Sequence, residues 1–162
     1  FLDSDDSWYS NKLEFQINYM LENNYGFTFS SYNIMLFDGV MTKKIVRVPK
    51  SINYQQYLGN TIIGCLTVVI DKNIVGPFIM PNIKSSHDMA LWLLILKRGF
   101  NAYGIDKVLA SYRLVPTSNS AKKHKAVKDV WKVYRTIENI GRVKSAYYFI
   151  CYAFNAVKKR IL

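Results

Sequence analysis

Hydrophobic residues at helical spacing occur near the start of the chain. Four apolar residues fall at i, i+4, i+7 and i+8: Leu13, Ile17, Met20 and Leu21. This spacing predicts an amphipathic helix over residues 11–23, and Ser10 is placed to cap its start.

Extended segments follow that helix. Residues 27–32 are apolar and β-prone, and residues 34–37 meet residues 40–48 across Asp38-Gly39, a dipeptide typical of a tight hairpin turn. Residues 61–70 are β-branched and apolar on both faces, which predicts a buried strand.

A fully apolar segment, residues 89–96, predicts a buried helix. It ends at Lys97-Arg98-Gly99, because basic residues before a glycine are typical of a helix C-terminus. Residues 107–114 predict one more strand. Since strands alternate with helices, we expect a mixed α/β fold, with a mixed sheet flanked by helices.

Residues 121–162 predict basic amphipathic helices at the C-terminal end. The first has one apolar stripe, with most of its lysines off that stripe: Val127, Val130, Trp131, Tyr134 and Ile137. Gly141 interrupts it, and residues 145–162 form a further segment with an aromatic middle and Lys158-Lys159-Arg160 near its end.

Composition matters mainly through the distribution of charge. The 162 residues have a net charge of +11, and residues 113–162 hold 12 basic and 2 acidic side chains. This asymmetry indicates a polyanionic partner: anionic lipid headgroups, a phosphate-bearing substrate or nucleic acid. The apolar and aromatic content excludes a disordered tail. The longest apolar runs, residues 89–96 and 146–154, are well short of the ~20 residues of a transmembrane helix.

Three carboxylates lie together at the start of the chain, on Asp3, Asp5 and Asp6. Such closely spaced charges repel one another unless a cation sits among them, and carboxylate oxygens suit Mg²⁺ or Mn²⁺. The same pattern also occurs in exposed turns, so the spacing alone leaves both interpretations open. Cys65 and Cys151 have no metal-ligand spacing.

A second candidate, Asp88, stands directly before the buried helix in Ser85-Ser86-His87-Asp88. A carboxylate at this position can accept backbone N–H bonds and complement the helix dipole. It can equally act as a general base that a rigid helix holds at the edge of a pocket.

A third candidate group follows a predicted strand. Arg113 is followed within ten residues by Ser118, Ser120 and Lys122. An arginine and hydroxyl groups after a strand suit a pyrophosphate, which arginine can bind bidentately. The alternative is an ordinary basic loop.

In this order, the three groups resemble the C-terminal part of a family 2 glycosyltransferase of the GT-A type, and the resemblance covers nearly the whole chain. Phe-Leu-Asp-Ser-Asp-Asp-Ser-Trp at residues 1–8 is similar to the metal-site motif of that family. His-Asp-Met-Ala-Leu-Trp-Leu at residues 87–93 is similar to its acidic catalytic motif, usually Glu-Asp-x-x-Leu-Trp-Leu. Tyr112-Arg113 and the loop after it resemble the late donor-phosphate loop.

The resemblance implies a metal-dependent, inverting glycosyltransferase of bacterial cell-surface polysaccharide synthesis. Asp3 and Asp5 would serve Mn²⁺ or Mg²⁺ and the nucleotide-sugar donor, a UDP-sugar by expectation, with Asp5 the more direct ligand. Asp6 would support them, and Asp88 would be the catalytic base. Arg113 would neutralise charge on the departing nucleoside diphosphate. The acceptor would be a glycan or a lipid-linked sugar.

The chain departs from the family pattern in two places. His87 stands where the family usually has Glu. The family pattern also has an N-terminal nucleotide-binding half before the segment that Phe1 begins, and we expect that this sequence is a piece without that half. We therefore expect residues 1–120 to be the acceptor and metal-site half of a partial GT-A domain, and we expect this piece to be inactive alone.

The resemblance also suggests a role for the C-terminal region. Aromatic side chains flanked by basic ones across residues 142–160 would anchor the enzyme to an anionic membrane, on its cytoplasmic, inner face. The alternative is a helix that covers the core. A competing hypothesis is a non-catalytic basic α/β module that binds lipid or nucleic acid. It leaves the carboxylates at Asp3–Asp6 and Asp88 unexplained, so we do not expect nucleic acid.

Overall fold

The computed structural model describes residues 1–83, 85–116 and 123–161. Its centre is a six-stranded mixed sheet with the path β1-β6-β2-β3, in which β4 also pairs with β6 and β5 with β2. The β2 and β6 strands run parallel, and the other pairs are antiparallel. The strands are β1 (Ser7–Trp8), β2 (Phe27–Met35), β3 (Met41–Val46), β4 (Ser51–Ile52), β5 (Val69–Ile70) and β6 (Ala102–Arg113).

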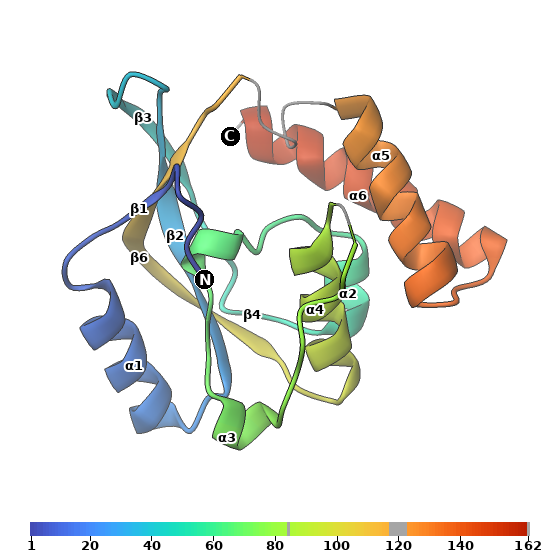
Figure 1. The fold of residues 1–162 in the computed structure, drawn as a ribbon, viewed down its shortest axis with the longest axis horizontal. Helices are drawn as coiled ribbons and strands as arrows, with labels where there is room; N and C mark the ends of the chain where they lie inside the picture. Colours follow the sequence, from blue (N-terminus) through green and yellow to red (C-terminus); the bar gives the residue numbers. More distant parts are fainter. Residues whose placement is uncertain (84, 117–122, 162) are drawn as a thin grey trace.

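Helices flank this sheet, which confirms the predicted mixed α/β fold (Figure 1). The α1 helix lies on one side, α2 and α4 lie on the other, and α5 and α6 lie beyond them. The helices are α1 (Lys12–Asn23), α2 (Tyr54–Leu58), α3 (Lys72–Val75), α4 (His87–Lys97), α5 (Lys123–Lys132) and α6 (Arg142–Ile161). They are supplemented by the 3₁₀ turn η1 (Cys65–Thr67) and the π-helical turn η3 (Val133–Ile137).

The main core forms between α4 and the sheet. Trp92 is fully buried and its ring lies 5.3 Å from that of Phe27 in β2. Almost the whole of α4 is buried, as its uninterrupted apolar sequence predicts. This core holds the N-terminal end of α4 rigidly, which positions Asp88.

The C-terminal helices are attached to the same core. Val130, Val133 and Tyr134 are buried in it. Glu138, after η3, accepts a hydrogen bond from Tyr54 of α2 at 2.5 Å and pairs with Lys97 of α4 at 3.0 Å. The predicted stripe is therefore buried only in part, because Val127 and Trp131 remain exposed.

The helix predicted over residues 11–23 forms, but its buried face is not the predicted one. Lys12, Gln16 and Met20 are buried, whereas Leu13, Ile17 and Leu21 are exposed. Ser10 does not cap the helix, since the residue at the cap position is Asn11 and its side chain accepts no capping hydrogen bond.

The strand predicted over residues 61–70 is wrong except at its end, where Val69–Ile70 pairs with β2. Side chains take the place of strand partners here: Trp8 donates to the Leu66 carbonyl at 2.7 Å, and Lys12 and Gln16 donate to that of Thr67. Because these carbonyl groups are satisfied, the backbone can leave the sheet and turn. The predicted segments 27–32 and 34–37 join into one strand, β2, which ends at Met35, before residues 36 and 37; the predicted hairpin with β3 is confirmed.

Candidate functional site

The first eight residues connect two of the predicted site motifs. The Phe1 ring packs edge-on against Trp92, with centroids 5.0 Å apart. Trp92 lies one helical turn after Asp88, so the N-terminal segment approaches the first turn of α4. In chain order, Asp3 and Asp5 follow this contact.

The same segment then joins the end of β6. Ser7 in β1 pairs with Ser111 in β6. The Asp6 carboxylate accepts a hydrogen bond from the Arg113 backbone N–H at 2.9 Å, and Arg113 Nε donates to the Asp5 carbonyl at 2.8 Å. The structure therefore brings the motifs around Asp3–Asp6, Asp88 and Arg113 to one place.

Asp88 lies in the first turn of α4 and is half-buried. The cap position belongs to Ser86, which has a φ of 56° and no side-chain cap hydrogen bond. Within the described part of the chain, the Asp88 carboxylate accepts no hydrogen bond. It is thus placed to accept a proton from a ligand. His87 beside it is exposed.

Cys65 in η1 reports how close the carboxylates are to one another. Burial, together with the negative charges of Asp88 and Asp3, raises the pKa of its thiol to about 12. A thiol that feels both charges must lie near both side chains. Sequence reasoning gave Cys65 no such place, because its neighbourhood depends on the turn that replaces the predicted strand.

The three N-terminal carboxylates differ in environment. Asp3 is exposed, and Asp5 and Asp6 are half-buried. The pKa of Asp6 is raised to about 6: burial raises it most, repulsion from Asp5 and Asp3 raises it too, and the hydrogen bond from the Arg113 backbone partly opposes this. The carboxylates therefore repel one another, and a cation beside them would relieve that repulsion.

The donor set fits a hard divalent cation with few protein ligands. Among residues 1–83, 85–116 and 123–161, no group of three or more His, Cys, Asp or Glu side chains is arranged to hold a metal. Mg²⁺ in nucleotide enzymes usually takes one or two carboxylates and completes its coordination with water and phosphate oxygens. Asp3 and Asp5 could supply that number.

Arg113 has a structural role, but not all of its guanidinium N–H groups are used in that role. Besides the bond to Asp5, its Nη1 donates to the Phe37 carbonyl in the β2–β3 hairpin at 3.0 Å. Two of its five guanidinium N–H groups are used in this way, and within the described residues the others are open to an anion. Ser118, Ser120 and Lys122, which we predicted to act with Arg113, lie outside the described residues.

The α5 helix reaches this region through a contact that sequence reasoning missed. Ser85, three residues before Asp88, donates a hydrogen bond to the Asp129 carboxylate of α5. The only signal in the sequence is that Asp129 is one of two acidic residues among residues 113–162. This contact brings a basic helix beside the loop that precedes Asp88.

Comparison with known proteins gives a consistent set of relatives. The chain is 49% identical over 161 residues to the "Putative teichuronic acid biosynthesis glycosyltransferase TuaG" of Bacillus subtilis, covering 99% of this chain and 64% of that protein. It is 39% identical over 162 residues to the "UDP-Glc:alpha-D-GlcNAc-diphosphoundecaprenol beta-1,3-glucosyltransferase WfgD" of Escherichia coli, covering 98% of this chain and 62% of that protein. It is 36% identical to WfaP of Escherichia coli, which has the same activity in its name, with the same coverage as for WfgD. No family model matches the sequence. The chain spans less than two thirds of the length of these relatives.

Proposed function

We propose that the protein containing this chain belongs to the family of these bacterial glycosyltransferases, and that it transfers a sugar from a nucleotide sugar to a hydroxyl group of a glycan or lipid-linked acceptor. We place it in family 2, with a GT-A catalytic domain to which residues 1–120 contribute the acceptor side. The observation that carries the proposal is the meeting of Asp3–Asp6, Asp88 and Arg113 at one end of the sheet.

In this proposal Asp88 is the catalytic base. Its carboxylate takes the proton of the acceptor hydroxyl as the hydroxyl oxygen attacks the anomeric carbon. The bond from that carbon to the nucleoside diphosphate breaks on the opposite side, so the configuration inverts. The buried α4 helix holds the base still, which favours a single productive geometry.

Arg113 would bind the leaving nucleoside diphosphate. Its backbone N–H is held by Asp6 and its Nε by the Asp5 carbonyl, so the guanidinium is fixed beside the carboxylates. The remaining N–H groups can donate to phosphate oxygens as negative charge develops on them. Asp6 therefore acts as a positioning residue.

Asp3 and Asp5 would hold Mn²⁺ or Mg²⁺, with Asp5 the more direct ligand. A divalent cation bound there would, together with Arg113, neutralise negative charge on the diphosphate. The nucleoside diphosphate we propose is UDP, which is also the donor nucleotide in the names of WfgD and WfaP.

The C-terminal helix supports a location at a membrane surface. Five exposed apolar residues of α6 fall at i, i+4, i+7, i+11 and i+14: Val143, Tyr147, Ile150, Phe154 and Val157. Tyr148, Phe149 and Tyr152 of the same helix pack against the core. The helix thus has two apolar faces, of which only one is used within the described chain.

Basic residues flank the exposed face of α6, among them Arg142, Lys144 and the exposed Lys158. Each basic group close to an anionic leaflet contributes about 1 kcal/mol to binding. No helix in the described part of the chain is both long and apolar enough to cross a membrane. We therefore propose a peripheral location at the cytoplasmic face of the membrane, which suits a lipid-linked acceptor.

Turnover of nucleotide sugars tests the proposed donor site. A protein of the relatives' full length that includes this chain would be incubated with Mn²⁺ and a panel of UDP- and GDP-sugars, and release of the nucleoside diphosphate would be measured. Asp5→Asn should lower turnover of the preferred donor by about 10²-fold or more, because the cation that would neutralise the diphosphate loses a charged ligand. Asp71→Asn is the matched control, since Asn caps α3 as well as Asp does. Equal turnover by the two variants, or none by the wild type, would refute the proposal.

A further inference from the structure

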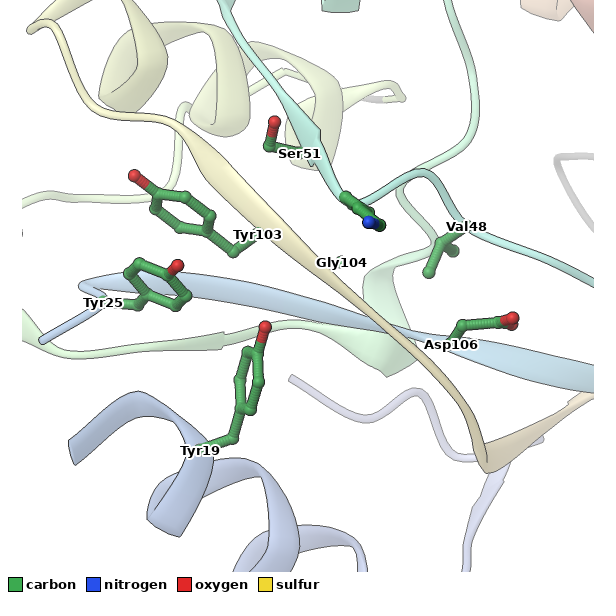
Figure 2. Close-up of a pocket in the computed structure, with 8 residues that line it drawn as sticks. Tyr19, Tyr25, Val48, Ser51, Tyr103, Gly104 and Asp106 are labelled. Carbon is green, nitrogen blue, oxygen red and sulfur yellow. The ribbon is translucent and has the colours of Figure 1, made fainter. Parts of the chain in front are cut away.

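A hollow of about 540 Å³ lies at the other end of β6 from Arg113 (Figure 2). Its lining includes Tyr19, Tyr25 and Tyr103 together with Lys50, Ser51 and Asp106. Arg113 lies seven positions after Asp106 in the same strand, about 23 Å along β6 at about 3.3 Å per residue. The hollow is therefore separate from the proposed transfer site, and its size is typical of a small-molecule pocket.

Three tyrosines form one wall of the hollow. The Tyr25 and Tyr103 rings stack with centroids 3.5 Å apart and an interplanar angle of 5°, and Tyr19 meets Tyr25 edge-on at 5.7 Å. Figure 2 shows these rings together on one side of Gly104, with Val48 and Asp106 on the other. The rings come from α1, β6 and the residues before β2, so three segments hold the wall in shape.

Gly104 allows residues 48–50, on the opposite side of the hollow, to lie close to β6. A Cβ at this position would lie 1.9 Å from the carbonyl oxygen of Pro49, so only glycine lets residues 48–50 approach β6 this closely. The Gly104 N–H donates to the Lys50 carbonyl at 2.9 Å, and Ser51 then pairs with Tyr103. This close approach places the Lys50 and Ser51 side chains beside the tyrosines.

Several donors around the hollow are unused within the described residues. The hydroxyl groups of Tyr19, Tyr25 and Tyr103 make no hydrogen bond there, and the Lys50 ammonium has no partner. Asp106 differs, because its carboxylate accepts from Arg47 at 2.9 Å and from Ser31 at 3.0 Å. The open groups therefore comprise three phenol hydroxyls and one positive charge.

We propose that this hollow is a saccharide-binding site that prefers a sugar bearing an acidic group. A sugar ring has apolar C–H surfaces and a rim of hydroxyl groups, which match tyrosine rings and their hydroxyls. A carboxylate or phosphate on the sugar would pair with Lys50. This site is independent of the proposed transfer reaction, and it would hold a glycan chain on the same domain.

Direct titration of a protein of the relatives' full length that includes this chain, without nucleotide sugar, tests this site. The probes are a hyaluronan tetrasaccharide, which carries carboxylates, and chitotetraose, which is neutral. We expect the acidic tetrasaccharide to bind at least about fivefold more tightly in calorimetry. Lys50→Gln should remove that preference, whereas Lys43→Gln, which removes another exposed charge, from β3, should leave it intact.

Tyr103→Phe is a second variant that keeps the stacked ring and removes only its hydroxyl. It should weaken binding of both tetrasaccharides, with an unchanged far-ultraviolet spectrum. Failure of both saccharides to bind would overturn the proposal, as would equal effects of Lys50→Gln and Lys43→Gln. Since no donor sugar is present, failure here leaves the transferase proposal untouched.

Discussion

At the scale of single residues, the least expected feature is the lysine buried at the start of α1. Lys12 is completely buried, and its Nζ donates to Gln16 Oε1 at 2.5 Å and to the Thr67 carbonyl at 3.1 Å. It lies 5.0 Å above the Trp8 ring. No carboxylate pairs with it among the described residues, so its charge is stabilised by dipoles and one aromatic face.

The burial of Lys12 predicts an unusual dependence of stability on pH. Burial lowers the pKa of its ammonium from 10.5 to about 8. Between these values the unfolded chain binds a proton that the folded chain has lost, so the free energy of unfolding should rise with pH. Relative to Lys12→Met, the wild type should gain about 2 kcal/mol between pH 7 and 9.5 in urea titrations. The comparison cancels the tyrosines, which titrate in both proteins. If the free energies of unfolding of the wild type and Lys12→Met differ by the same amount across this pH range, the lowered pKa of Lys12 is contradicted.

The same helix shows what periodicity alone can predict. The spacing of Leu13, Ile17 and Leu21 correctly predicted a helix, but not which side is buried. The buried face is chosen by distant groups, since Gln16 donates to Thr28 Oγ1 and to the Thr67 carbonyl. An i, i+4 pattern does not reveal the carbonyl groups of a turn 51 residues later along the chain, which need hydrogen-bond donors from this helix.

At the scale of elements, local sequence patterns predicted an element correctly where its backbone hydrogen bonds are made within that element or with its neighbour in the chain. The hairpin at Asp38-Gly39 and the buried α4 helix both formed as predicted. Residues 61–70 had an equally strong apolar pattern, but only Val69–Ile70 forms a strand. The rest turns away because side chains of β1 and α1 satisfy its carbonyls, a non-local arrangement.

The close approach of residues 48–50 to β6 predicts a sharp cost for a methyl group at Gly104. Gly104→Ala should lower the free energy of unfolding by at least about 1–3 kcal/mol, because its Cβ would overlap the Pro49 carbonyl oxygen. Gly141→Ala is the matched control, since a Cβ there meets nothing within 4 Å. Urea denaturation of both variants checks this. Equal stabilities would mean that the two segments do not approach as described.

The two faces of α6 predict separable effects on membrane binding and on folding. A triple variant, Tyr147→Ser, Ile150→Ser and Phe154→Ser, should reduce binding to phosphatidylglycerol-containing vesicles by about tenfold or more, because inserted apolar area is lost. The melting temperature should change little, since all three side chains are exposed. Flotation assays measure the binding.

The α1 helix provides the control for that experiment. The triple variant Leu13→Ser, Ile17→Ser and Leu21→Ser removes three apolar residues that are also exposed, from the other side of the sheet. Vesicle binding should survive this change. If both triple variants bind vesicles as well as the wild type, α6 is not a membrane anchor.

At the scale of the whole molecule, three motifs that are far apart in the sequence occupy one end of the sheet. Their order and residue types indicated a glycosyltransferase, and the relatives agree with that family. The contacts between them could not be predicted. Residue spacing does not reveal that Phe1 packs on Trp92, or that Arg113 is held by Asp5 and Asp6. The tyrosine-lined hollow was likewise hidden, because its walls come from separate segments of the chain.

The most direct test of the central claim is the kinetics of Asp88→Asn in a protein of the relatives' full length that includes this chain. If Asp88 is the base that deprotonates the acceptor hydroxyl, kcat should fall by about 10²–10⁴-fold while the affinity for the nucleotide sugar stays nearly the same. Asp71→Asn should match the wild type. A variant Asp88→Asn that keeps wild-type kcat, or that loses donor affinity as much as turnover, would contradict the assignment of Asp88 as the base.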